Sequence, residues 1–121
     1  MVPHIPCSEL FLRLGDDDVL VLDCRGPEDW ERLELHVPGA LHLTAVELAD
    51  VASSLPDDEL IVLCGSGPGE RDTHHAWKVL QQAGLTAVCL EGGLQAWVTL
   101  GFPTESHSAR GALQERAWRH A

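Results

Sequence analysis

The chain has 121 residues, which suits one domain, and its 45% apolar content supports an ordinary hydrophobic core. Eight lysines and arginines against nineteen aspartates and glutamates give a formal net charge of -11, which opposes binding to nucleic acids and anionic membranes. We find no apolar run long enough to span a bilayer and no secretory signal in residues 1–8, so the expected location is cytoplasmic.

Four short apolar runs are predicted to be strands. Two of them, Val19–Leu22 and Leu60–Leu63, are continuously apolar and follow acidic segments, which is typical of strands buried on both faces. The third run follows the turn residue Gly84, and the fourth is the shortest. The predicted strands cover residues 19–22, 60–63, 86–90 and 40–43.

Helical patterns separate these strands. Ser8 is a suitable N-cap, Pro27 suits a first helical position, and Gly84 is a helix stop. The predicted helices cover 8–15, a segment from 27, then 45–52, 76–83 and 92–97. Strand and helix in alternation predict an α/β fold with a central parallel sheet covered by helices on both faces.

The domain is predicted to occupy residues 1–103. Residues 104–121 contain few large apolar side chains, so they are predicted to form a frayed or loosely docked tail.

The four cysteines, at positions 7, 24, 64 and 89, include no Cys-x-x-Cys pair and are predicted to be free thiols. His74 and His75 are adjacent, and adjacent helical residues point in different directions, so they make a poor zinc pair. We therefore predict surface histidines, no metal site and no cofactor.

The segment from Cys64 to Arg71 is the candidate site, because it joins a predicted strand to a predicted helix. In an open parallel sheet, ligands bind at the carboxyl ends of strands. The glycine-rich loop lets backbone N–H groups converge on one point, and the following helix, capped by Asp72 or Thr73, adds its positive end. Such dipoles stabilise a thiolate or persulfide anion and would lower the pKa of Cys64. The alternative interpretation is that Cys64 is a buried cysteine at a strand end, followed by an ordinary glycine-rich turn and without a chemical role.

Further segments lie in a fixed order around this strand and loop. They begin with an Asp-x-Arg segment at Asp23 and a His-x-Pro-Gly-Ala segment at His36, and the Cys64 strand follows. The remaining segments lie at 82–85, 90–97 and 101–103. With these segments the chain resembles the rhodanese-like sulfurtransferase family over residues 5 to 103.

The resemblance implies a three-layer fold with a central parallel sheet of about five strands. It implies that Cys64 is the catalytic residue and accepts sulfane sulfur from thiosulfate or a persulfide. A thiophilic acceptor, namely cyanide, a thiol or a sulfur-accepting protein, would then collect it. The expected substrate-binding residues are those of the loop: Gly65, Ser66, Gly67, Gly69, Glu70 and Arg71.

Two features depart from the family pattern. Arg71 lies seven positions after Cys64, beyond the six-residue loop of common single-domain members, so the pocket is expected to be wider and less positive. Residues 32–35 form an insertion that lengthens a helix or loop.

Three functions stay open on the sequence alone. The first is a sulfurtransferase or persulfide carrier. The second is a phosphatase or arsenate-reductase-like enzyme, which the wider loop and its Glu70-Arg71 ending would suit. The third is a non-catalytic interaction module in which Cys64 is incidental.

Overall fold

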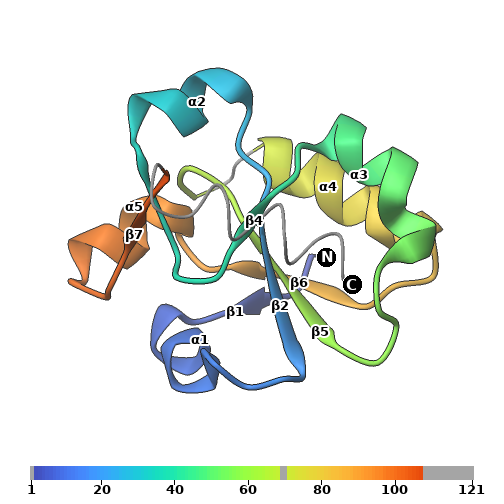
Figure 1. Cartoon of the computed structure of the whole chain (residues 1–121), viewed down its shortest axis with the longest axis horizontal. Coiled ribbons are helices and arrows are strands. Elements are labelled where there is room, and N and C mark those ends of the chain that lie inside the picture. The colour runs from blue at the N-terminus through green and yellow to red at the C-terminus, as the bar shows by residue number, and fades with distance from the viewer. Residues whose placement is uncertain (1, 69–70, 108–121) are drawn as a thin grey trace.

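The computed structural model describes residues 2–68 and 71–107, and nothing is said below of the structure of the others (Figure 1). Seven strands and five α-helices alternate along this part of the chain, with one 3-10 turn after α3. Their bounds are β1 His4–Ile5, α1 Cys7–Arg13, β2 Val19–Asp23, α2 Pro27–Arg32, β3 Leu35–His36, β4 Leu41–His42, α3 Ala45–Val51, β5 Leu60–Cys64, α4 Arg71–Gln82, β6 Ala87–Leu90, α5 Gly93–Thr99 and β7 Glu105–Ser106.

The main sheet is parallel and has five strands in the order β1-β6-β5-β2-β4. This confirms the predicted fold class and the four predicted strands. The pattern missed β1, β3 and β7, because two-residue strands are too short to show a period. β3 and β7 pair antiparallel in a second, small sheet beside the main one.

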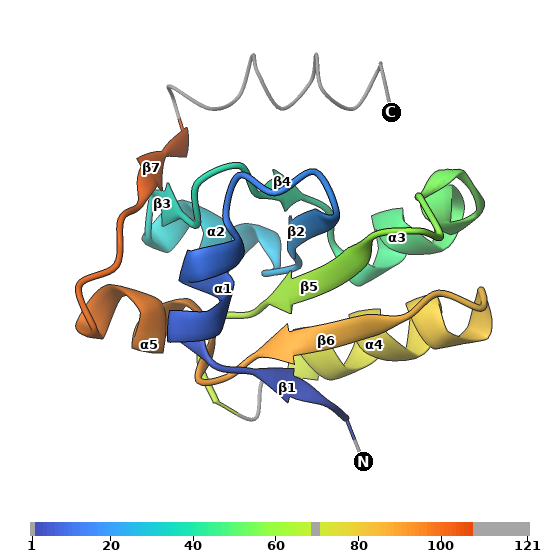
Figure 2. The same cartoon turned by 90° about the horizontal axis from the view of Figure 1, so that it is seen from below.

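Alternating side chains divide the core between the two faces of the sheet. Figure 1 shows α3 and α4 on one side and α1 on the other, and Figure 2 shows the same layers from below. On the α3/α4 face, Leu22, Leu63 and Cys89 pack with Leu48 and Leu80. On the α1/α5 face the buried side chains are Ile5, Cys7, Leu10, Val21, Val37, Ala40, Val62, Cys64, Leu90, Leu94 and Trp97. Cys64 therefore belongs to the α1/α5 face.

Two helix starts differ from the prediction. α1 begins at Cys7 after Pro6, so Ser8 lies inside the helix instead of capping it. α4 begins at Arg71, and the Asp72 carboxylate accepts a hydrogen bond from the Gly26 N–H at 3.1 Å. Neither Asp72 nor Thr73 is therefore the N-cap, and Asp72 instead ties α4 to the loop after β2.

The described part of the predicted tail is attached to the domain. Leu35 pairs with Ser106 and His36 with Glu105, and His107 stacks on Trp30 with ring centroids 3.6 Å apart. The rest of the predicted tail, residues 108–121, lies outside the described residues. Within 2–68 and 71–107, no helix combines the length and apolar character that crossing a membrane requires.

The turn before α5 needs glycine for two reasons. Gly92 and Gly93 both have positive φ, at 75° and 63°. A Cβ on Gly93 would also lie 2.8 Å from the Gly65 carbonyl oxygen and 2.8 Å from the Gly67 nitrogen. α5 thus packs directly on the backbone of the loop that follows Cys64.

We therefore predict that Gly93→Ala destabilises the protein by about 2 kcal/mol more than Gly15→Ala. Gly15 is the matched control, because its φ of 92° imposes similar strain but a Cβ there meets nothing within 4 Å. Urea unfolding of both variants measures the difference. Equal losses would mean that the loop backbone does not pack on Gly93.

Candidate active site

Cys64 is the last residue of β5, the central strand of the sheet, and its side chain is fully buried. Its carbonyl oxygen accepts a hydrogen bond from the Cys24 N–H at 3.0 Å, and this fixes the end of the strand. The thiol therefore lies at the carboxyl edge of the parallel sheet, where the sequence placed it.

The predicted lowering of the Cys64 pKa is wrong for this arrangement. Burial raises the pKa of the Cys64 thiol well above its ordinary value, and the neighbouring Asp23 carboxylate raises it further. The Arg25 guanidinium opposes this change but does not reverse it. Burial therefore favours the thiol form of Cys64 over the thiolate, because removal from water disfavours the anion.

The loop after Cys64 turns carbonyl groups toward α5. The Gly65 and Ser66 carbonyls accept hydrogen bonds from the Leu94 and Gln95 N–H groups at 2.8 and 2.9 Å. Among residues 65–68 and 71, no amide donates a hydrogen bond to the Cys64 sulfur. The predicted ring of amides is thus not formed by the described part of the loop, and Gly69 and Glu70 lie outside it.

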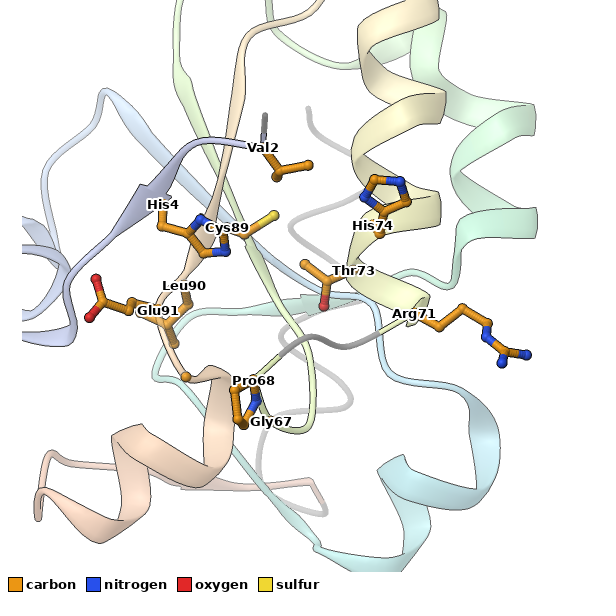
Figure 3. A pocket seen from close by; sticks show the side chains of 11 residues that line it. Val2, His4, Gly67, Pro68, Arg71, Thr73, His74, Cys89, Leu90 and Glu91 are labelled. Atoms are coloured by element: carbon orange, nitrogen blue, oxygen red, sulfur yellow. The ribbon is translucent and has the colours of Figure 1, made fainter.

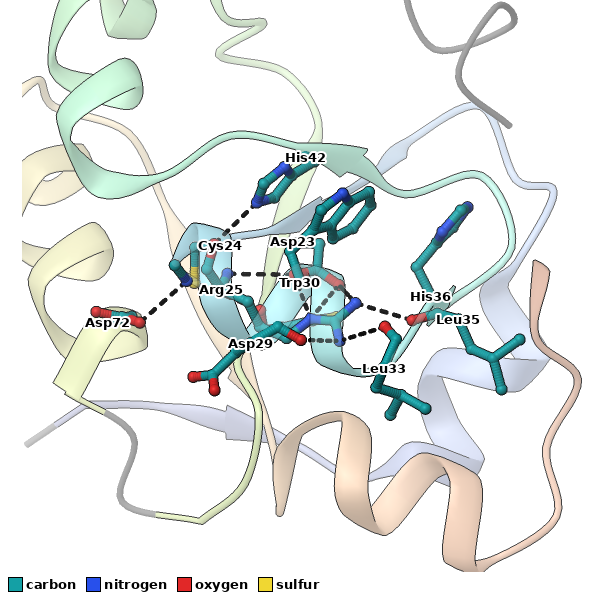
Figure 4. A network of polar contacts seen from close by, with 12 residues as sticks. Asp23, Cys24, Arg25, Asp29, Trp30, Leu33, Leu35, His36, His42 and Asp72 are labelled. Carbon is teal, nitrogen blue, oxygen red and sulfur yellow. Dashed lines mark hydrogen bonds and ion pairs between the residues drawn. The ribbon is translucent and has the colours of Figure 1, made fainter. Parts of the chain in front are cut away.

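A buried ion pair lies beside the thiol. Asp23 is the register partner of Cys64 on the neighbouring strand, so the two side chains share one face. Both Asp23 oxygens accept from Arg25, with Nε–Oδ1 and Nη2–Oδ2 distances of 2.9 Å, and both residues are almost fully buried. The two side chains thus form a buried ion pair (Figure 4).

Arg25 also holds the end of α2 and the start of β3. Its Nη1 donates to the carbonyls of Asp29 and Leu33, and its Nη2 donates to that of Leu35 at 2.8 Å. The Arg25 carbonyl in turn accepts from His42 Nε2 at 2.8 Å, which requires the proton of His42 on that nitrogen. All five N–H groups of Arg25 are therefore engaged within the protein.

One cavity beside the loop lies between β6 and α4, and we call it the β6–α4 cavity. Its volume is 640 Å³, and its lining includes Gly67, Pro68, Arg71, Thr73 and Cys89. Cys89 and Thr73 project toward its middle, whereas the Arg71 guanidinium points away (Figure 3). Burial raises the pKa of the Cys89 thiol to about 11. The lining includes no atom of Cys64.

A second, smaller cavity lies between α2 and α5, and we call it the α2–α5 cavity. It has a volume of 270 Å³ and is lined by Arg25, Asp29, Arg32, Leu33, Ser66, Leu94, Gln95, Val98 and Thr99. Leu94 packs in the same buried cluster as Cys64, and Ser66 lies two residues beyond it. Cys64 itself is not among the residues that line this cavity either.

The structure places the site residues that were predicted from sequence in different surroundings. Ser66 lines the α2–α5 cavity, Gly67 and Arg71 line the β6–α4 cavity, and Gly65 is buried. Sequence reasoning missed Arg32 and Gln95. Gln95 belongs to the Gly-Gly-Leu-Gln run that packs on the loop, so this run could have indicated that Gln95 lies near the site. No sequence pattern around Arg32 indicated its position.

Cys24 is unsuited to act as a partner for Cys64. It packs in the core of the α3/α4 face, and its sulfur lies 3.8 Å from the Thr73 hydroxyl. All four cysteines are free and buried. Within the described ranges, no group of three or more histidine, cysteine or acidic residues could hold a metal ion.

The fold and Cys64 define the class of protein: a parallel α/β domain with a cysteine at the carboxyl end of its central strand. A rhodanese-like domain model matches residues 7–100 of the chain. The chain belongs to the rhodanese-like domain family.

Three relatives illustrate the range of this family. The "Putative sulfurtransferase YtwF" of Bacillus subtilis (strain 168) is 30% identical over 84 residues, which cover 69% of this chain and 77% of that protein. The "HTH-type transcriptional regulator Rv0324" of Mycobacterium tuberculosis (strain ATCC 25618 / H37Rv) is 29% identical over 98 residues. That match covers 81% of this chain but 42% of the regulator.

The third relative is a solved structure. The solution structure of the rhodanese-like domain from the Anabaena sp. Alr3790 protein superposes with a TM-score of 0.71 at 33% identity. The match covers 88% of this chain and 80% of that one.

We predict that Arg25→Met lowers the free energy of unfolding by about 3–5 kcal/mol, because it leaves the Asp23 carboxylate buried without its partner. Arg32→Met is the control. Its 3.2 Å ion pair with Asp29 is exposed, and such pairs contribute less than about 1 kcal/mol. Urea unfolding measures both losses, and comparable losses would contradict a special role for the buried pair.

Proposed function

We propose that the chain is a sulfurtransferase in which Cys64 accepts sulfane sulfur and passes it to a thiophilic acceptor. The observation that carries this proposal is the position of Cys64 at the carboxyl end of the central strand, directly before the glycine-rich loop. Membership of the rhodanese-like family and the name of the Bacillus subtilis relative support it.

The chemistry has two half-reactions. The Cys64 thiol first loses its proton to solvent, and the thiolate attacks the outer sulfur of thiosulfate. The new sulfur–sulfur bond gives a Cys64 persulfide, and sulfite leaves with the electron pair of the broken bond. A thiolate or cyanide then attacks the terminal sulfur, which leaves with it and regenerates the Cys64 thiolate. Neither half-reaction needs a cofactor.

The proposed substrate-binding segment is residues 65–71. In this proposal its amides would hold the charge on the terminal sulfur only after the loop rearranges, because its described amides do not donate to the Cys64 sulfur. The loop carbonyls bonded to α5 keep Ser66 in place during this exchange.

A second candidate is a non-catalytic module. The complete burial of Cys64 and its raised pKa favour it, since both hinder attack by the sulfur. The chain also matches only part of a transcriptional regulator, so similar domains occur inside longer proteins, as expected of an interaction module.

Sulfur loading separates these candidates. We expect thiosulfate to add one sulfur atom to the intact protein, removable by a reductant or by cyanide, which becomes thiocyanate. Cys64→Ala should abolish the addition, and Cys89→Ala, which removes another buried thiol, should retain it. Mass spectrometry gives the readout.

Other outcomes would decide against sulfur transfer. No addition from thiosulfate or an organic persulfide between about pH 7 and pH 10 would favour the module. Release of phosphate from an aryl phosphate that depends on Cys64 would favour the phosphatase.

The rate of loading should rise with pH. Only the thiolate attacks, and because the Cys64 pKa is raised, the thiolate fraction grows about tenfold per pH unit through neutrality. Stopped-time mass measurements from about pH 7 to pH 9 test this expectation. A rate that is already constant at neutral pH would mean that the thiol is acidic and that the loop amides surround it.

A further inference from the structure

Residues 105–107 hold the last described part of the chain against the domain, and we call this segment the β7 latch. Its backbone pairing with β3 covers two residues on each strand, Leu35 with Ser106 and His36 with Glu105 (Figure 2). A ribbon of two such short strands is not stable by itself in water. Side-chain contacts must therefore contribute to the attachment, and histidines make the closest of them.

His107 makes four described contacts with the domain. Its ring stacks on the Trp30 indole, with the ring planes 5° apart and the centroids 3.6 Å apart. Its Nε2 lies 2.7 Å from the Trp30 carbonyl oxygen, and its Nδ1 lies 2.8 Å from Nδ1 of His36. Its backbone N–H donates to the Glu34 carbonyl at 3.2 Å. The His36 side chain is fully buried, so the contact between the two imidazoles lies away from solvent on that side.

These distances fix where the protons lie. A carbonyl oxygen only accepts, so His107 Nε2 carries a proton. In a neutral His107 the Nδ1 atom is then an acceptor, and the proton of the bond between the two Nδ1 atoms belongs to His36. In this arrangement each ring holds one proton and the pair is uncharged. The latch thus uses one particular tautomer of each ring.

The pair can take up one more proton and keep its bonds. His36 Nε2 lies 3.7 Å from Glu105 Oε1, so a proton on this nitrogen makes an ion pair with a carboxylate of the latch itself. The bond between the two Nδ1 atoms is unchanged, because His36 still donates and His107 still accepts. A first added proton therefore tightens the latch.

A second added proton cannot be accommodated. It must occupy His107 Nδ1, and then two N–H donors face each other across 2.8 Å with no acceptor between them. Two positive rings would also lie with their centroids 5.0 Å apart, while the Glu105 carboxylate is already paired with one of them. Both effects favour a detached latch, in which water solvates each ring separately.

The other charged groups that the described residues place around the pair do not relieve this conflict. The Arg25 guanidinium lies 5.1 Å from the centroid of the Trp30 ring, and Asp23 holds it in a buried ion pair. His42, on β4, stacks on the same indole and donates its Nε2 proton to the Arg25 carbonyl in either charge state. Glu34, before β3, is exposed, so water and salt screen its charge.

We infer that the β7 latch is an acid-released switch, in which uptake of a second proton by the His36–His107 pair breaks their bond and frees β7 from β3. Imidazoles change charge between about pH 8 and pH 5, so release is expected as the pH falls through this range. The segment that leaves stacks on Trp30 and pairs with Leu35, whose carbonyl accepts from Arg25 Nη2 at 2.8 Å. Release therefore uncovers an indole and removes one support of β3, and it does not depend on sulfur transfer.

The test is amide hydrogen exchange of the full chain, followed by NMR. The rate is expressed as a protection factor, which removes the intrinsic pH dependence of exchange. The His107 N–H, which is bonded to Glu34, should lose at least about tenfold in protection between about pH 7 and pH 5. Leu63, in the central strand β5, reports global unfolding and should change by less than about twofold.

Two substitutions separate the titrating proton from the contact. In His107→Asn the amide oxygen accepts from His36 Nδ1 but takes up no proton. Its protection should be lower at neutral pH and change less than about twofold on acidification. Glu105→Gln keeps an acceptor for the Gly39 N–H at 2.8 Å but loses the charge that stabilises the first proton, so release should shift to higher pH. His75→Asn, at an exposed position of α4, is the control and should behave as the unmodified chain.

Three results would overturn the inference. One is constant protection of His107 over this pH range, and another is an equal loss of protection in His107→Asn. The third is an equal loss at Leu63, which would mean general acid unfolding. The nitrogen shifts of the histidine rings give a check that needs no variant. At neutral pH the proton should lie on Nε2 of His107 and on Nδ1 of His36, and the reverse tautomers would contradict the latch.

Discussion

The ion pair between Asp23 and Arg25 is the constraint on which the site depends. Two opposite charges are buried together at the end of β2, where each would be very unfavourable alone. Once placed there, Arg25 can satisfy its remaining donors only by gathering the carbonyls of α2, the following turn and β3. The pair thereby sets where α2 ends, which in turn sets where Arg32 lies relative to the loop.

The same pair shapes the chemistry of Cys64. Its net charge is near zero, so it provides little field to stabilise a thiolate on the next strand, and the Asp23 carboxylate is the nearer influence. The loop carbonyls face α5 and leave the sulfur among apolar side chains.

The fold was predictable because its main strands are continuous apolar runs and its helices carry clear faces or a proline start. The two-residue strands β1, β3 and β7 could not be predicted, because hydrogen-bond pairing with distant residues defines them and no apolar pattern marks them. For the site, the strand-loop-helix pattern located Cys64 at the end of a strand, but the buried ion pair beside it was not predicted. The pKa was predicted in the wrong direction, because glycines show that a loop can turn but not whether its amides or its carbonyls face inward. Arg32 was missed as a cavity residue because the α2–α5 cavity forms only where residues of α2, α5 and the loop come together in the fold.

The opposite faces of the sheet explain why residues adjacent in sequence can serve different cavities. Ser66 and Gly67 are neighbours, yet one lines the α2–α5 cavity and the other the β6–α4 cavity. A loop that crosses the edge of a parallel sheet necessarily borders both helical layers, whereas the strand-end side chain can point into only one of them. Cys64 itself packs in the core of the α1/α5 face and is not among the residues that line either cavity, so a ligand in one of them would contact the loop and not the sulfur.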